Sequence, residues 1–163
     1  MLRPKRKQYI RQFSLSDNYL SVIMLGIMFM CGLFIVWTYS FLAVAAYLGL
    51  WALSYIIIYA GTCRYCAYYG KKCPIPFEGS CVHHFFKKKE TFNFFQLFWA
   101  TAAYGFRVIL PVIFIFRDSM TGWGIAYFLL LTGFWIIHLR LTGCPNCINT
   151  QCPLNPDGKF KTS

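Results

Sequence analysis

Acidic residues are scarce in this chain, and none lies inside its long apolar stretches. Only five of the 163 residues are Asp or Glu, and 13% are charged, whereas an ordinary soluble domain has about 25% charged residues. The sequence also lacks paired carboxylates, a Ser-His-Asp set, a P-loop and a dinucleotide-binding glycine motif. These absences exclude the common hydrolase and kinase chemistries and leave carboxylate-based acid–base catalysis poorly supported.

In place of charge the chain has apolar residues, which make up 58% of it. They gather in four stretches of about the 20 residues that a helix needs to cross a bilayer, at residues 19–39, 41–60, 94–116 and 122–139. In lipid the backbone must satisfy its own hydrogen bonds, so helices are expected, and the alternating pattern of a membrane β-barrel is absent. The sequence predicts an all-α integral membrane protein with four transmembrane helices in a lipid bilayer.

Short links join the first stretch to the second and the third to the fourth, which predicts two antiparallel helical hairpins. The first stretch is expected to be a retained anchor, because no small-residue cleavage site follows it. The chain then divides into a basic N-terminal segment, a first hairpin, a Cys/His-rich loop, a second hairpin and a Cys-rich tail, at residues 1–18, 19–60, 61–93, 94–141 and 142–163.

The basic residues are distributed unevenly around these stretches. Fourteen of the 16 Lys and Arg residues lie before the first stretch, between the second and third, or after the fourth; Arg107 and Arg117 are the exceptions. Because cytoplasmic loops are rich in Lys and Arg, we expect both termini and the central loop in the cytoplasm, at the inner or plasma membrane. The net charge of +11 then reflects topology and attraction to anionic lipid, and no basic soluble domain remains to bind nucleic acid.

Seven of the eight cysteines occur in two short polar segments, one after each hairpin. Cytoplasmic thiols are kept reduced, so such clusters favour metal sites or catalytic thiols over disulfides. Each segment contains a CxxC pair at an equivalent hairpin end. Side by side, the pairs would supply the four thiolates of a structural zinc site or an iron–sulfur cluster, from Cys63, Cys66, Cys144 and Cys147.

The other cysteines of these segments predict a second set of ligands. Three sulfurs and one nitrogen would come from Cys73, Cys81 and Cys152 together with His83 or His84. The spacing leaves zinc and iron–sulfur open. Cys-Pro dipeptides close many ferredoxin motifs, whereas the Cys-Pro-Asn-Cys sequence at 144–147 resembles, over these four residues, one knuckle of a rubredoxin or zinc ribbon. Cys31 lies in the first stretch and is expected to be an apolar core residue.

Two polar residues within the stretches are candidates for cofactor binding. Arg107 lies near the middle of the third stretch, where a charge costs about 2.5–3.5 kcal/mol. No stretch offers it an acidic partner, so we expect a carbonyl, a hydroxyl, water, a lipid phosphate, a ligand or another subunit there, or else snorkelling to the interface. Pro111 frees the Arg107 carbonyl and predicts a kink. His138, at the end of the fourth stretch, is either a metal or quinone-site residue or simply interfacial.

These features favour a membrane redox protein whose iron–sulfur centre exchanges electrons with a partner subunit, with a quinone near Arg107 or His138. The alternative is a structural zinc module that staples the two hairpins of a small subunit or assembly factor. A transporter of soft metals, which would place thiols or methionines along its path, is disfavoured, because Cys31 is the only cysteine in the apolar stretches and only Met24, Met28 and Met30 lie near it.

A fourth possibility is thiol–disulfide exchange. The chain resembles the DsbB and vitamin K epoxide reductase families in size and helix number, which would imply an enzyme that pairs cysteines with quinone. Those families place their active cysteines on the oxidising side of the membrane. They also carry cysteines in the link between the first two spans, where this chain has none.

Overall fold

The computed structural model describes residues 5, 7–75, 77–90, 94–150, 152 and 155–157. This part of the chain is mostly helical and contains no β-strand, which confirms the helical prediction. Its α-helices are α1 (Leu15–Trp37), α2 (Phe41–Gly61), α3 (Glu78–Phe85), α4 (Phe94–Ala103), α5 (Ile109–Arg117) and α6 (Thr121–Ile136). Shorter 3₁₀ or π-helical turns are η1 (Cys63–Tyr65), η2 (Tyr104–Arg107), η3 (Ile137–Thr142) and η4 (Cys144–Asn146).

The helices α1 and α2 correspond to the first two apolar stretches, and serines define where they begin. The Ser14 hydroxyl accepts a hydrogen bond from the Asp17 N–H, and the Asp17 carboxylate accepts one from the Ser14 N–H. This capping box satisfies two backbone donors, so α1 begins at Leu15, before the expected start at residue 19. Ser40 caps α2 through the Ala43 N–H. Helices α1, α2 and α6 with its continuation are each long and apolar enough to cross a membrane.

The third apolar stretch is broken instead of forming one straight helix. The axes of Phe98–Arg107 and Ile109–Arg117 differ by 46°. Pro111 has no N–H to give to the Arg107 carbonyl, and such a missing bond is a common cause of a sharp kink. The kink expected from Pro111 is therefore present, and the chain has a fourth candidate span only if α4 and α5 are counted as one bent span.

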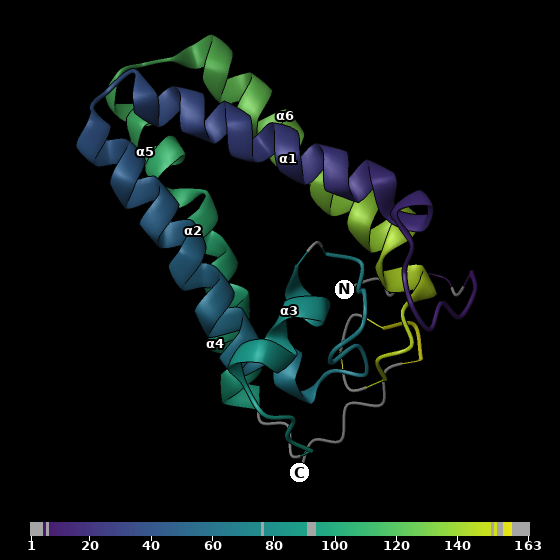
Figure 1. Cartoon of the computed structure of the whole chain (residues 1–163). Helices are drawn as coiled ribbons and strands as arrows, with labels where there is room; N and C mark the ends of the chain where they lie inside the picture. Colours follow the sequence, from purple (N-terminus) through teal and green to yellow (C-terminus); the bar gives the residue numbers. More distant parts are fainter. Residues whose placement is uncertain are drawn as a thin grey trace.

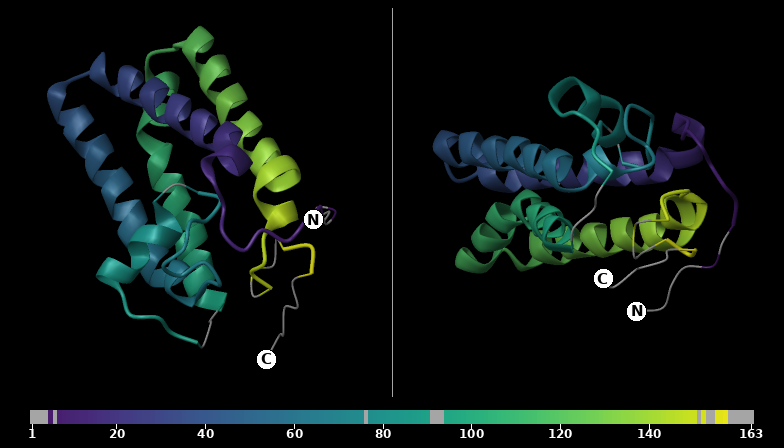
Figure 2. Two further views of the ribbon diagram at one scale, coloured as in Figure 1. Left: turned by 45° about the vertical axis from the view of Figure 1, so that its right-hand side comes forward. Right: turned by 90° about the horizontal axis from the view of Figure 1, so that it is seen from below.

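The long helices form two V-shaped hairpins that lie one over the other (Figures 1 and 2). In one hairpin α1 and α2 diverge from their link, and in the other α5 and α6 do so. Helix α1 packs along α6, and α2 packs along α4, so each arm of the V contains one helix from each hairpin. Packing between the two hairpins is thus more extensive than packing between the two arms of either hairpin.

The arms meet at the closed end of the V, where small residues allow close approach. A Cβ atom at Gly32 would lie 2.5 Å from the Tyr47 hydroxyl oxygen and 3.1 Å from the ring of Pro111. Glycine therefore lets α1, α2 and α5 come together, as small residues do in membrane helix packing. The Tyr47 hydroxyl donates to the Phe29 carbonyl at 3.2 Å, which ties α2 to α1.

The polar segments gather at the open end of the V (Figure 1). The Lys7 N–H donates to the Pro145 carbonyl at 3.2 Å, and the Ile10 N–H donates to the Asn146 carbonyl at 2.9 Å. The Tyr9 hydroxyl contacts the Asp157 carboxylate at 2.6 Å. The described N-terminal segment, the cysteine-rich loop and the tail therefore share one end of the helices, as the charge distribution predicts.

Candidate functional site

Each CxxC pair forms one 3₁₀ turn directly after a long helical segment. In the first, the Cys66 N–H donates to the Cys63 carbonyl at 3.2 Å; in the second, the Cys147 N–H donates to the Cys144 carbonyl at 3.3 Å. The second cysteine of both pairs then has an extended backbone, with ψ of 151° and 137°. The two pairs thus have the same local geometry. Each turn contains two cysteines that are close in sequence, as in structural zinc sites.

Tyr68 joins the two cysteine segments to each other and to the N-terminal segment. Its hydroxyl donates to the Ile10 carbonyl at 2.6 Å and accepts a hydrogen bond from the Ile148 N–H at 3.1 Å. The ring is fully buried and lies 5.7 Å from the ring of Phe13. Asn149 adds a second connection, because its side-chain amide donates to the Cys66 sulfur at 3.3 Å. Sequence reasoning missed this role of Tyr68, which depends on how three distant segments meet.

The two segments enclose a cavity of about 230 Å³ at the open end of the V. Six cysteines line it, drawn from both segments: Cys63, Cys66, Cys73, Cys144, Cys147 and Cys152. His138 and Glu78 also line it, as do apolar side chains such as Ala100 and Trp135. Six thiols exceed the four that one zinc ion or one iron–sulfur cluster needs. The volume of the cavity is also several times the roughly 30 Å³ that one water molecule occupies in the liquid.

The cavity thiols do not converge on one point. Among the described residues, no three Cys, His, Asp or Glu side chains are placed so that they could hold one metal ion. Cys147 and Cys152 nevertheless contribute to the raised pKa of both Cys66 and Cys144. Cys66 comes from the loop and the other three thiols from the tail.

Cys63 and Cys73 line the same cavity as Glu78. The four cysteines that were predicted to group together, Cys63, Cys66, Cys144 and Cys147, all line one cavity.

Burial raises the pKa of the Cys66, Cys73 and Cys144 thiols and so favours their protonated form. Desolvation raises the pKa of Cys66 to about 12, with Cys147 and Cys152 adding to the rise. Desolvation also raises the pKa of Cys73, and the nearby Glu78 carboxylate raises it further. A thiol of high pKa is a poor nucleophile, whereas a bound cation deprotonates a coordinating thiol outright. The site is therefore poorly suited to unassisted thiol–disulfide exchange and suits ligands that lose a proton when metal binds.

Hydrogen-bond donors already contact three of the sulfur atoms. The Gly79 N–H donates to the Cys73 sulfur at 3.3 Å, the Asn149 N–H donates to the Cys147 sulfur at 3.4 Å, and the Asn149 side chain donates to Cys66. Such bonds stabilise a thiolate and tune the potential of a cluster. A Cβ atom at Gly79 would lie 2.5 Å from the Lys71 carbonyl oxygen, so only glycine allows the backbone at position 79 to lie this close to the backbone of the loop.

His138 forms part of the cavity wall from the π-helical turn η3. The residue is 7% exposed, and its ring stacks on Phe134 with a centroid distance of 5.7 Å. Its Nδ1 atom has no hydrogen-bond partner in the part of the chain that the structure describes. A Cβ atom at Gly143 would lie 2.4 Å from the imidazole ring. Buried polar atoms normally have partners, and π-helical turns are frequent at functional sites, so His138 is available to a ligand in the cavity.

The structure places Cys81 and His83 outside the cavity. Both lie on α3, where His83 is exposed and Cys81 packs against the cluster at the end of α2. The second predicted set of ligands is therefore not brought together. Cys73 and Cys152 line the cavity of the CxxC pairs instead. Cys31 packs against the core at the closed end of the V, in keeping with its expected apolar role.

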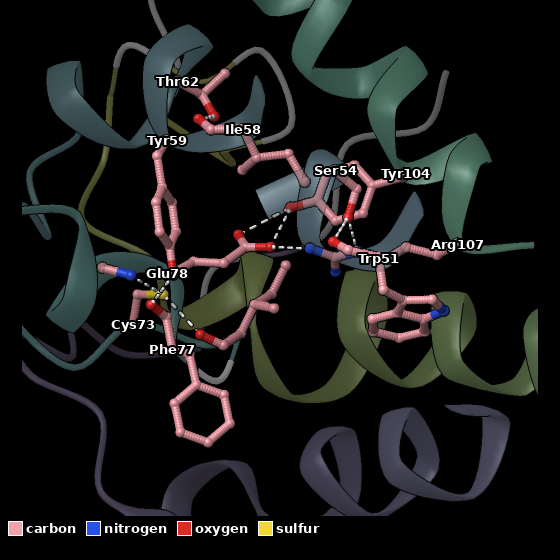
Figure 3. A network of polar contacts seen from close by, with 12 residues as sticks. Trp51, Ser54, Ile58, Tyr59, Thr62, Cys73, Phe77, Glu78, Tyr104 and Arg107 are labelled. Atoms are coloured by element: carbon pink, nitrogen blue, oxygen red, sulfur yellow. Dashed lines mark hydrogen bonds and ion pairs between the residues drawn. The ribbon is translucent and has the colours of Figure 1, made fainter. Parts of the chain in front are cut away.

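Arg107 is buried and paired with a carboxylate (Figure 3). It is 2% exposed, its Nη2 lies 3.1 Å from Glu78 Oε1, and its Nε donates to Ser54 Oγ at 2.9 Å. The Tyr104 hydroxyl donates to both Glu78 oxygens, at 2.9 and 3.1 Å. The prediction that Arg107 lacks an acidic partner is wrong, because Glu78 reaches it from the cysteine-rich loop.

Aromatic rings complete the surroundings of this ion pair. The Arg107 guanidinium carbon lies 5.0, 4.2 and 4.8 Å from the ring centroids of Trp51, Tyr55 and Tyr104. Desolvation raises the pKa of Glu78, and the charge of Arg107 opposes that rise. These contacts hold the charge inside the protein, so the snorkelling alternative does not describe Arg107. The pair also fastens the start of α3 to the broken third span.

No protein-family model matches the chain, and no curated protein or solved structure is significantly similar to it. The chemistry of the site is therefore the basis for inferring function. Six thiols and an imidazole around one cavity make up a donor set typical of soft or borderline metals.

Proposed function

We propose that the chain is an integral membrane protein that holds a metal centre between its two cysteine segments. One observation carries this proposal. A single cavity is lined by six cysteines, which come from the two segments on either side of the second helical hairpin. Cys66 from the loop and Cys144, Cys147 and Cys152 from the tail are the first four ligands that we assign. His138 lines the same cavity and would supply a nitrogen donor beside them.

The exposed surface of the long helices supports insertion into a membrane. Large apolar side chains are exposed on this surface, including Phe41 at 80% exposure and Leu42 at 78%. Soluble monomers rarely expose wide apolar patches. The cysteine segments and the described N-terminal segment share the end of the helices that carries ten of the twelve basic residues that the structure describes. We therefore place this end in the cytoplasm, at the inner or plasma membrane.

We favour an iron–sulfur centre that transfers electrons at the membrane surface to a membrane or cytoplasmic redox partner. The number of thiols and the cavity volume of about 230 Å³ both exceed what one zinc ion requires. The N–H groups that contact Cys66, Cys73 and Cys147 are of the kind that tunes cluster potentials.

A structural zinc site is the alternative, and the paired turns support it. The two CxxC turns have matching geometry, as the two halves of a structural zinc site do. A zinc ion between them would staple the ends of the two hairpins without any redox role. Such a protein would serve as a subunit or an assembly factor.

Elemental analysis and an absorption spectrum of anaerobically purified protein test the proposal. We expect stoichiometric iron with a broad visible absorption band that bleaches on reduction or in air. Colourless protein with stoichiometric zinc supports the structural alternative. Protein that is folded but contains neither metal, with all six cavity thiols open to alkylation, rules out both functions.

A further inference from the structure

A second cavity, of about 200 Å³, lies between the two arms of the V beside Arg107. Its walls come from α1, from the broken third span and from α6, and they include Met28, Tyr104, Gly105, Arg107, Phe134 and Trp135. Apart from Arg107, Tyr104 and Thr101, the wall is apolar. Clefts lined by apolar side chains with a few placed polar groups are the usual form of a small-molecule site.

Arg107 has one hydrogen-bonding group left for a ligand. A guanidinium carries five N–H donors. Nε is bound to Ser54 and Nη2 to Glu78, whereas Nη1 makes no hydrogen bond to the described residues. The side chain is almost fully buried and lines the cavity. Nη1 is not among the fully buried polar atoms that lack a partner, so an acceptor atom in the cavity can reach it.

The charge balance decides which acceptor fits. Glu78 already neutralises Arg107 at 3.1 Å. A fatty-acid carboxylate or a phosphate would therefore add an uncompensated negative charge to a buried site, which is strongly unfavourable. A neutral carbonyl oxygen accepts the Nη1–H bond without this cost. The charge balance therefore favours a neutral ligand with a carbonyl group.

The shape of the cavity adds two further requirements. The ring of Trp135 lies edge-on to those of Tyr104 and Phe134, with centroid distances of 6.0 and 5.6 Å, and such aromatic walls suit a flat ring. The volume of about 200 Å³ is below the roughly 300–1,000 Å³ of pockets for drug-sized ligands. It accommodates a head group, with the rest of the ligand in the lipid.

We infer that this cavity binds the head group of a lipid-soluble quinone, with one ring carbonyl accepting a hydrogen bond from Arg107. The cavity shares Thr101, Tyr104 and Trp135 with the cysteine-lined cavity, so the quinone ring lies next to the proposed metal centre. Quinone binding itself goes beyond the proposed function and does not depend on a metal being bound.

Quenching of tryptophan fluorescence by a short-chain ubiquinone tests this inference, with the full-length protein in lipid nanodiscs. Gly105→Leu fills the cavity wall, where an added Cβ meets no atom within 4 Å. Gly49→Leu is the matched control, since Gly49 is equally open but lies on α2 outside both cavities. We expect saturable quenching in the wild type and the control, and at least tenfold weaker binding in Gly105→Leu.

A second variant and a competitor make the result decisive. The double variant Glu78→Gln with Arg107→Met removes both charges and the donor, and it should also bind quinone at least tenfold more weakly. Oleate should not displace the quinone. Non-saturable quenching by the folded wild type, unchanged affinity in Gly105→Leu, or displacement by oleate would overturn the inference. Metal content, measured on the same samples with and without chelator, reports separately on the proposed function.

Discussion

Replacing Cys66 and Cys147 together by serine is expected to abolish metal binding by the purified protein. The two residues line the same cavity from different segments, so the change removes one ligand from each segment. Serine is a poor ligand for the soft and borderline metals that thiolates select. Because a structural metal contributes about 10–16 kcal/mol of binding free energy, losing two of four ligands should reduce the metal content from stoichiometric to near zero.

Cys81→Ser and Cys31→Ser are the matched controls for this experiment. They make the same chemical change, but neither residue lines the cavity. We expect both to retain full metal content and, for iron, the visible absorption of the wild type. Equal metal loss in the controls, or full metal content in the Cys66/Cys147 double variant, would show that the cavity is not the metal site.

The second large effect is expected from Glu78→Gln, which leaves the Arg107 charge buried without its partner. Removing one member of a buried ion pair typically costs about 3–5 kcal/mol, and we expect a loss of unfolding free energy of this size. The measurement is reversible denaturation of the protein in mixed micelles, followed by far-UV circular dichroism. The aromatic rings around the guanidinium give it no alternative acceptor of full charge.

The double variant Glu78→Gln with Arg107→Met supplies the control. It removes both charges, and an uncharged replacement of a buried pair often costs little. The double variant should therefore be more stable than Glu78→Gln alone, and the cycle should show a coupling free energy well above that of independent sites. Additive losses would contradict the pairing at 3.1 Å between Arg107 and Glu78.

Glu78 also connects the two cavities. It lines the cysteine-lined cavity and contacts Arg107 and Tyr104, which line the second one. The Glu78 carboxylate is thereby one of the contacts that anchor the loop to the helical arms, beside the hydrogen bond from the Tyr59 hydroxyl to the Phe77 carbonyl.

The helices were predictable because their determinants are local. Length and composition alone indicate α1, α2 and α6, and Pro111 indicates the break in the third stretch. The earlier start of α1 follows from the Ser14–Asp17 capping box, a motif that is visible in the sequence but that a hydropathy pattern does not register.

The partner of Arg107 was not predictable in the same way. Glu78 is 29 residues away and lies in a polar loop, so a search of the apolar stretches for a carboxylate could not find it. The scarcity of acidic residues was the available clue, since a lone Glu between Cys73 and Cys81 has few partners to choose from. The path by which the loop returns to the helices is a tertiary property.

The candidate site was predictable in part. Equivalent positions after two hairpins correctly indicated that Cys66 and Cys147 lie at the same end of the helices. Which cysteines share a cavity depends on α3, which carries Cys81 and His83 away from it, and on Tyr68, which draws the loop to the tail. The position of His138 depends on a π-helical turn, and no sequence pattern specifies one.

X-ray absorption spectroscopy at the metal K edge of anaerobically purified protein tests the central claim most directly. We expect a first shell dominated by three or four sulfur atoms at about 2.3 Å, the usual zinc–sulfur distance and similar for iron–thiolate bonds, with at most one nitrogen. Metal–metal scattering should appear as well if the centre is an iron–sulfur cluster. A shell made only of oxygen and nitrogen, or the lack of any stoichiometric metal, would contradict the assignment of the cysteine-lined cavity as a metal centre.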